Sequence, residues 1–315
     1  MTESIPFFSV VIPLYNKEDY IERTLRSVIN QSFNDYEIIV INDGSTDKSL
    51  EKLKPYINKG RLRIITQLNK GLSYSRNEGF RLSEGQYVAF LDADDYWHPD
   101  YLLSHKASIE AFPKEVIFGT SYSQIIDGKA LDIITNIDQR LKGKTFVLND
   151  FFTANIRQFI PCQSTIVLRK NAFELPLYDE SITYFEDVDF YLNHCTNKSV
   201  VITYKPLAYI EFSQANQMSK TALTNKILPD LSAYKKQYRG NKTILNYIDM
   251  QLYKIGIKYA VAGETEKKKE IISIINMDSL TFKQRMLISK PNWIIKRLID
   301  VKKMLLKLNI RMTSF

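Results

Sequence analysis

Carboxylate side chains gather at three places in the chain. Asp92-Ala93-Asp94-Asp95 holds three acids within four residues, and the other two groups are Asp43-Gly44-Ser45-Thr46-Asp47 and Phe185-Glu186-Asp187-Val188-Asp189. Carboxylates this close repel one another unless a cation offsets their charge. Hard divalent ions such as Mn²⁺ and Mg²⁺ take oxygen ligands, usually one or two carboxylates together with phosphate and water. The group at Asp92 therefore predicts a Mn²⁺ or Mg²⁺ site, and a solvated acidic turn is the alternative.

The Asp43 group has two compatible interpretations. Gly44 supplies a turn, and Ser45, Thr46 or Asp47 can cap the following helix through a side-chain oxygen. A carboxylate at a strand end can also accept the N–H of a pyrimidine base, and Tyr15 offers a face on which that base would stack. Capping and base recognition can use different residues of the same loop.

Two further features could serve group transfer. The acids Glu186, Asp187 and Asp189 include a candidate base, because a positioned carboxylate can take a proton from a hydroxyl and the chain has only three histidines. Stabilisation of a helix dipole is the alternative. Arg76 lies near the start of a predicted helix, where a guanidinium and the N-terminal amides together favour a diphosphate. An exposed helix arginine is the alternative there.

Alternating strands and helices are expected to position these groups. Short apolar runs alternate with helix-like stretches before Asp95, which is the pattern of βαβ units around a parallel sheet. Ligands of such sheets bind beyond the carboxyl ends of the strands, where the Asp43 and Asp92 groups lie. We expect an α/β fold with a Rossmann-like, mostly parallel sheet flanked by helices. The predicted strands are Phe8–Ile12, Tyr36–Ile41, Leu62–Thr66 and Tyr87–Leu91, and the predicted helices are Ile21–Ile29, Thr46–Ile57 and Leu72–Leu82.

The pattern changes after Asp95. A predicted helix over Pro99–Phe112 and an antiparallel hairpin turning at Asp127-Gly128-Lys129 indicate that the sheet becomes mixed. From about Ala222 the sequence indicates Lys-rich helices only. We therefore predict a ligand-binding catalytic domain over residues 1–220 and a basic helical C-terminal region over residues 221–315.

Cysteine usage and hydropathy indicate the compartment. Cys162 and Cys195 lie far apart and form neither a disulfide framework nor a zinc pattern, which fits a reducing environment. No signal peptide is visible, and no stretch reaches the roughly 18 apolar residues of a spanning helix. We expect a cytoplasmic protein, either soluble or peripheral on the inner face of the membrane.

Positive charge is concentrated near the C-terminus. Between Phe282 and Phe315, nine basic residues accompany the single acid Asp300. Apolar residues at helical spacing from Ile294 to Leu308, with Trp293 at the start, predict an amphipathic helix that could bind an anionic membrane surface. A helix packed on the catalytic domain with a solvated basic face is the alternative. Nucleic-acid binding is not expected, because aromatic residues are not interleaved with the basic ones.

Five motifs, taken in order, resemble those of the family-2 inverting glycosyltransferases, which have the A-type fold. The motifs are Ser9–Asn16, Asp43–Asp47, Asn69–Gly79, Phe90–Asp95 and Glu186-Asp187. The resemblance implies that Pro13, Tyr15 and Asp43 line the nucleoside pocket and that Arg76 lies near the donor. It also implies that Asp92 lies near the ribose, that Asp94 is the metal ligand and that Asp187 is the general base.

One departure from the family concerns the metal or diphosphate. Many relatives carry a histidine where this chain has Gln214–Ser219, and no histidine follows His194. This leaves one ligand position unassigned, and Gln214 is a candidate to replace the histidine. The residues after about 220 show no resemblance that assigns them a role.

The resemblance implies a metal-dependent reaction that inverts the anomeric carbon. A sugar would move from a nucleotide diphosphate donor, most often a uridine diphosphate sugar, to a hydroxyl of a glycan or lipid-linked acceptor in surface polysaccharide or glycan synthesis. Two alternatives stay open. An aspartate-dependent phosphotransferase also places carboxylates at strand ends, although it gives no role to Asp43 or Arg76. A degenerate nucleotide-binding or membrane-associated assembly module without transferase activity is compatible with the missing histidine.

Overall fold

The chain forms two compact units in this computed structural model, which describes residues 5–59, 61–212, 223 and 225–307. The first unit comprises Met1–Gln214 with Ile227–Pro229, and the second comprises Ala215–Lys226 with Asp230–Phe315. The predicted boundary at residue 220 lies outside the described residues.

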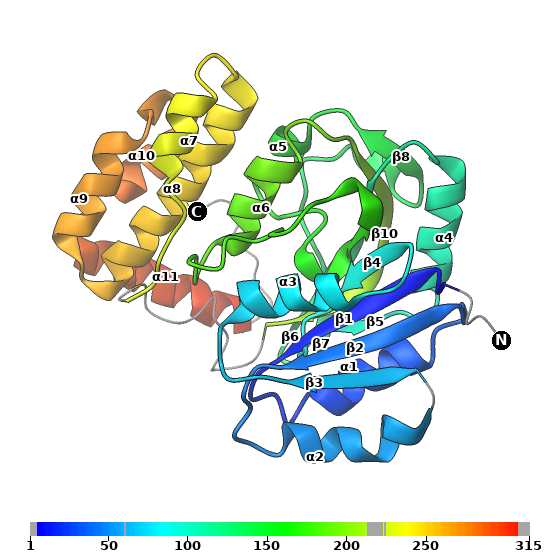
Figure 1. The fold of residues 1–315 in the computed structure, drawn as a ribbon. Helices are drawn as coiled ribbons and strands as arrows, with labels where there is room; N and C mark the ends of the chain where they lie inside the picture. The colour runs from blue at the N-terminus through cyan, green and yellow to red at the C-terminus, as the bar shows by residue number, and fades with distance from the viewer. Residues whose placement is uncertain (1–4, 60, 213–222, 224, 308–315) are drawn as a thin grey trace. The chain divides into compact units, whose positions relative to one another are not determined.

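The first half of the sheet is parallel, as the alternation of strands and helices predicts. Strand β1 lies between β2 and β4, and β2 also pairs with β3. Helix α3 lies on one side of these strands, and α1 and α2 lie on the other (Figure 1). The bounds are β1 Phe8–Leu14, α1 Ile21–Ile29, β2 Tyr36–Asn42, α2 Ser49–Leu53, β3 Leu62–Thr66, α3 Leu72–Leu82 and β4 Tyr87–Phe90.

The second half of the sheet is mixed, which confirms the change expected after Asp95. The strand order is β3-β2-β1-β4-β9-β6-β10-β5, with β7 paired to β6 and β8 paired to β10. The predicted hairpin is β6–β7, in which Asp127 and Gly128 both have positive φ. The remaining elements of this unit are β5 Tyr96–Trp97, α4 Tyr101–Ala111, β6 Ile117–Ile126, β7 Lys129–Asp132, β8 Thr145–Leu148, α5 Phe151–Ala154, β9 Ile166–Arg169, α6 Glu186–His194 and β10 Val200–Glu211.

The central strands are buried along their whole length. Every residue of β1, β2 and β4 is buried, because helices cover both faces of this part of the sheet. One predicted helix differs: in place of Thr46–Ile57, α2 begins at Ser49 and a 3₁₀ helix continues it over Lys54–Lys59. The backbone N–H groups of Thr46 and Asp47 instead donate to the Asn16 side chain, which holds both residues in the loop.

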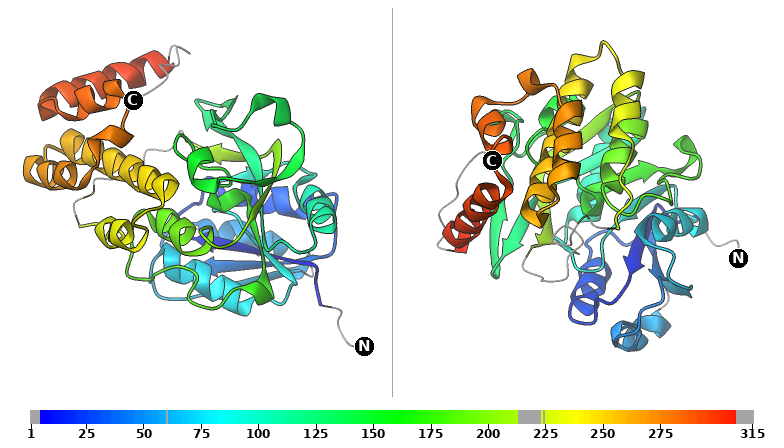
Figure 2. Two further views of the ribbon diagram at one scale, coloured as in Figure 1. Left: turned by 90° about the horizontal axis from the view of Figure 1, so that it is seen from above. Right: turned by 90° about the vertical axis from the view of Figure 1, so that its left-hand side faces the viewer.

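The second unit is helical in all its described elements. Helix α8 contacts the other four helices of this unit, which are coloured yellow to red in Figure 2. Its Gly256 lets the Ile288 side chain of α10 approach closely. No helix within the described residues is long and apolar enough to cross a bilayer. The bounds are α7 Leu231–Gln237, α8 Lys242–Ala262, α9 Thr265–Ile274, α10 Phe282–Ile288 and α11 Asn292–Lys307.

Candidate active site

The loops that follow β1 and β2 are joined by hydrogen bonds. Asn16, which adopts a φ of 49°, donates its backbone N–H to Ser45 Oγ and accepts the Thr46 N–H at 2.8 Å through Oδ1. Asn is one of the few residues that tolerate such a φ. The Lys17 backbone N–H donates to Ser49 Oγ in the same way. These bonds fix the strand-end loops relative to each other.

Asp43 is buried at the end of β2 and holds the start of α3. Its Oδ1 accepts the Lys70 N–H and the Gln67 side-chain amide, each at 2.8 Å, and its Oδ2 accepts the Gly71 N–H at 2.8 Å. An ionised carboxylate has about four acceptor positions, so three partners leave about one for a ligand. Asp43 therefore serves the fold whether or not it also contacts a base.

The three acids that follow β4 have different surroundings. Asp92 accepts a 2.8 Å bond from Arg76, and Asp94 pairs with Lys17 Nζ at 2.7 Å. The Asp92 side chain is 32% exposed and the Asp94 side chain 15% exposed. Two protein cations thus offset the repulsion that led us to predict a metal, and Asp92 and Asp94 form the open edge of the loop.

The Asp95 side chain is buried, unlike those of Asp92 and Asp94, and its hydrogen bonds hold the loop in place. Its carboxylate accepts the Ser164 hydroxyl at 2.6 Å and the Glu211 backbone N–H at 2.9 Å. Burial, and then the nearby Asp94 and Asp92, raise the pKa of Asp95 well above its usual range. Helix α1 supports the same loop, because Thr24 Oγ1 lies within hydrogen-bond distance of the carbonyl oxygens of Ala93 and Asp95. These bonds therefore hold the backbone of the loop that carries Asp92 and Asp94 in a fixed position.

Arg76 is buried and bridges two acidic groups that are far apart in sequence. Its guanidinium lies 2.8 Å from Asp92 Oδ1 and 3.0 Å from Glu186 Oε1, and it stacks over the Tyr178 ring at 5.3 Å. Burial alone would lower the pKa of Arg76, but Asp92, Tyr178 and Glu186 outweigh it and raise that pKa above its usual range. The alternative of an exposed helix arginine is wrong, since the residue is 1% exposed.

Asp187 follows Glu186 in the first turn of α6 and is partly exposed. Its Oδ1 accepts the N–H of Val188 at 2.8 Å. Burial, and then the Asp187 and Glu186 carboxylates, raise the pKa of Tyr184. Phe185, directly before the pair, has a φ of 66°, and a bulky residue with such a backbone is uncommon outside functional sites. The Arg76 bridge thus connects the first turn of α6, which contains Asp187, with the loop that follows β4.

Comparison with known families identifies the family of this chain. The model of glycosyl transferase family 2 matches residues 9–174, which is more than half of the chain. The chain belongs to glycosyl transferase family 2. The matched stretch contains Asp43, Arg76 and the Asp92–Asp95 loop, whereas Asp187 lies beyond it. The family assignment gives no support to an aspartate-dependent phosphotransferase.

Individual relatives cover only part of this family-2 chain or part of their own length. The glycosyltransferase EpsJ of Bacillus subtilis (strain 168) is 30% identical over 197 residues, which are 60% of this chain and 56% of EpsJ. A chondroitin synthase of Escherichia coli is 37% identical over 120 residues, 38% of this chain and 17% of that protein. The match thus spans about half or less of these relatives.

A solved structure confirms the A-type glycosyltransferase fold. Residues 1–349 of TarS of Staphylococcus aureus, in complex with UDP-GlcNAc, match with a TM-score of 0.62 over 92% of this chain and 88% of that chain. The two sequences are 19% identical, so this likeness concerns the fold alone.

The oxygens of Asp92 and Asp94 are ligands of the kind that Mn²⁺ and Mg²⁺ prefer. No group of three or more His, Cys, Asp or Glu side chains that could hold a metal occurs within the described part of the chain. An ion bound here would therefore take its remaining ligands from substrate phosphates and water, as Mg²⁺ commonly does. The position of the family's histidine, Gln214–Ser219, lies outside the described residues.

The two remaining residues predicted to line the nucleoside pocket, Pro13 and Tyr15, lie at the end of β1. Pro13 is buried within β1, and the Tyr15 side chain just beyond it is 48% exposed. Sequence reasoning missed Lys17 and Ser164. Lys17 could have been noticed as a cation in the loop that follows the predicted strand Phe8–Ile12, whereas no sequence signal connects Ser164 with Asp95. The assignment of Pro13, Tyr15, Asp43, Arg76 and Asp92 to the donor stays a prediction.

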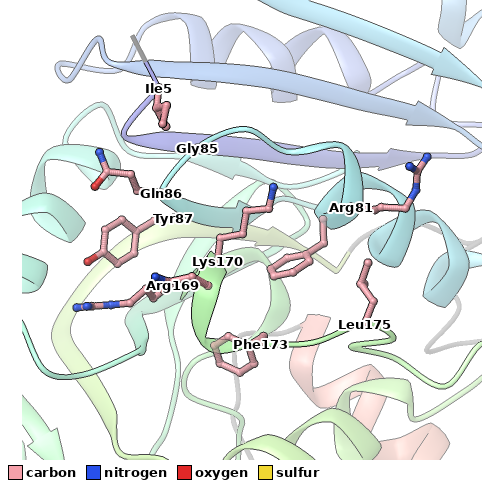
Figure 3. Close-up of a pocket in the computed structure, with 11 residues that line it drawn as sticks. Ile5, Arg81, Gly85, Gln86, Tyr87, Arg169, Lys170, Phe173 and Leu175 are labelled. Carbon is pink, nitrogen blue, oxygen red and sulfur yellow. The ribbon is translucent and has the colours of Figure 1, made fainter.

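A separate cavity of about 580 Å³ lies beside the residues that precede and begin β4 (Figure 3). The start of β4 pairs with the start of β1, so this cavity is at the opposite end of these strands from Asp92. Its cations already have partners: Arg81 pairs with Glu78, Lys170 donates to the Ser83 carbonyl and Arg169 donates to the Pro113 carbonyl. We assign this cavity no ligand.

Proposed function

We propose that this protein transfers a sugar from a uridine diphosphate sugar to a hydroxyl of a glycan or lipid-linked acceptor, with inversion and with Mn²⁺ or Mg²⁺. The observation that carries the proposal is the Arg76 bridge between Asp92 and Glu186. It joins the acidic strand end expected to bind the donor with the helix start that carries the candidate base. One buried cation thereby organises both halves of a two-substrate site.

The relatives support the choice of donor and product. The structure of TarS that shares this fold is a complex with UDP-GlcNAc, and the chondroitin synthase relative makes a polysaccharide by its name. A uridine base would stack on Tyr15 and meet Asp43, which retains about one acceptor position. We therefore favour a uridine nucleotide and a role in surface polysaccharide or glycan synthesis.

The chain's own residues suit a single displacement. Asp187 would take the proton of the acceptor hydroxyl as that oxygen attacks the anomeric carbon, on the face opposite the leaving diphosphate. Asp92 and Asp94 would hold the donor and a divalent ion, which supplies Lewis-acid stabilisation of the charge that develops on the leaving group. Hydrogen bonds to the sugar hydroxyls strengthen as oxocarbenium character develops, and so would contribute to donor choice.

Binding of nucleotide sugars in the presence of Mn²⁺ tests the proposal directly. A panel of uridine, guanosine and thymidine diphosphate sugars is compared by thermal shift. A ligand at a hundred times its Kd stabilises the folded state by about 2.7 kcal/mol. We expect the largest shift from a uridine diphosphate sugar, followed by slow release of UDP through hydrolysis. Donor binding without any hydrolysis or transfer would support an inactive nucleotide-binding module instead.

Asp94→Asn is expected to remove the Mn²⁺-dependent part of the thermal shift. The substitution keeps the shape of the side chain but replaces an anionic metal ligand by a neutral amide, which binds a hard cation more weakly. The melting temperature with UDP should then be the same with Mn²⁺ and with EDTA. Asp132→Asn is a matched control, because Asp132 lies on the exposed strand β7, where its carboxylate pairs with Lys142. A normal Mn²⁺ response in Asp94→Asn would remove Asp94 from the metal site.

A further inference from the structure

Helix α11 packs on the rest of the second unit through one face. On α11, Ile295 is fully buried and Ile299 packs beside it, against a cluster that includes Ala260 of α8 and Leu287 of α10. Burial lowers the pKa of Lys302, which follows on the same face at helical spacing. This packed face is thus defined by Ile295, Ile299 and Lys302, and it accounts for only part of the apolar surface of the helix.

A second apolar stripe faces outward on α11. Trp293, Val301 and Met304 are 66%, 47% and 57% exposed. Together with Arg297 they recur at steps of four, four and three residues, which places them on one side of the helix, away from Ile295 and Ile299. A solvated face would carry polar residues at all four positions, whereas here only Arg297 is polar. We call Trp293, Arg297, Val301 and Met304 the outer stripe.

Helix α10 repeats the pattern. Leu287 and Ile288 are buried within the second unit, whereas Phe282 and Met286, one turn apart, are 73% and 51% exposed. Large apolar side chains exposed on two consecutive helices indicate a surface that binds a membrane or another protein.

The charge around these side chains decides what that partner is. From Phe282 to Lys307 the chain has eight basic residues and one acid, Asp300. Lys283, Lys290, Lys296 and Arg297 are all exposed. A second copy of this surface would bring like charges together, which is unfavourable. Exposed apolar side chains, a tryptophan and an excess of lysine and arginine are the features of helices that lie in the interface of an anionic bilayer.

We propose that α10 and α11 dock this protein on an anionic membrane surface, with the outer stripe, Phe282 and Met286 inserted among the head groups and the exposed lysines against anionic lipid. The outer stripe extends over about three turns of α11. Since no helix within the described residues is long and apolar enough to cross a bilayer, α11 would lie within the interface. The proposal concerns the second unit alone and is independent of the catalytic assignments.

Tryptophan fluorescence of the full chain tests the docking. The chain has two tryptophans, and Trp97 is 2% exposed and stacked on Tyr101, so a change caused by vesicles reports Trp293. Vesicles with about one-third phosphatidylglycerol should shift the emission to the blue and bind the protein, and high salt should reverse this. Phosphatidylcholine vesicles should have little effect. Trp293→Phe should remove the emission change while leaving most of the binding.

Two sets of substitutions separate the apolar and charged contributions. Trp293→Ser/Val301→Ser/Met304→Ser should lower vesicle binding at least tenfold, because each large side chain contributes through burial in the interface. Lys296→Ala/Arg297→Ala should lower it about twenty-five-fold at low salt, at about fivefold per charge. The control Leu103→Ser/Lys129→Ala removes an exposed leucine and an exposed lysine from the first unit and should leave binding unchanged.

Circular dichroism confirms that each variant is folded before binding is compared. Unchanged vesicle binding in both sets, or equal binding to neutral and anionic vesicles, overturns the proposal. Concentration-dependent dimerisation that the serine substitutions abolish, without vesicle binding, would assign the surface to a second copy of the chain. Binding of an acidic protein without binding of vesicles would likewise exclude the membrane.

Discussion

Asp187→Asn is expected to abolish sugar transfer while nucleotide binding is retained. An asparagine amide cannot take a proton at neutral pH, and a positioned general base contributes about 10²–10⁴-fold to the rate. The asparagine keeps the size of the side chain, and its carbonyl oxygen can still accept the Val188 N–H that Asp187 accepts. The affinity for UDP should therefore stay close to that of the native protein.

The measurement combines UDP release with calorimetric titration of UDP. The donor is the nucleotide sugar that gives the largest thermal shift, and water serves as the acceptor until the natural one is identified. Asp189→Asn is the matched control, because Asp189 is an acid in the same helical turn but is buried and bonded to Asn193. Native rates in Asp187→Asn would move the base to another residue, whereas loss of UDP binding would give Asp187 a structural role.

Arg76→Met is expected to lower the free energy of unfolding by about 3 kcal/mol or more. Removing one member of a buried ion pair costs about 3–5 kcal/mol, because the charge left behind has no partner. Here two carboxylates lose their partner, and the 32% exposure of Asp92 places the expected cost near the lower end of that range. Arg76→Lys should recover only part of the stability, since an ammonium lacks the planar fork that reaches both acids.

Chemical denaturation measures this effect, and two further variants interpret it. Arg81→Met, on the same helix, removes an exposed arginine paired with Glu78 and should have little effect on the free energy of unfolding, because exposed ion pairs are screened by solvent. Adding Glu186→Gln to Arg76→Met should restore part of the stability, because one of the two uncompensated charges disappears. An equal cost for Arg76→Met and Arg81→Met would show that the bridge does not hold the site together. Weaker UDP binding in a folded Arg76→Lys protein would connect the bridge to the donor.

The sequence by itself determined the parallel half of the fold and the carboxyl ends at which its chemistry lies. Helix α3 spans Leu72–Leu82 as predicted, and β3 and the hairpin turn at Asp127-Gly128 also agree with the structure. Periodicity and turn chemistry act over short stretches of chain, so a local pattern is sufficient for them. The placement of Asp43 and Asp92 after strands follows from the same patterns, since parallel strands end at one edge.

Only the tertiary structure decided which partner each charged group has. Arg76 and Glu186 are 110 residues apart, and no local pattern could pair them or show that Arg76 is buried. Asp92, Asp94 and Asp95 are nearly adjacent in sequence, but one meets an arginine, one a lysine and one a buried serine. Similarly, the sequence predicted an amphipathic α11, but its packed face had to be known before the outer stripe could be recognised. Burial and charge pairing depend on chain segments brought together from a distance, and the contacts that do so are fixed only when the chain has folded.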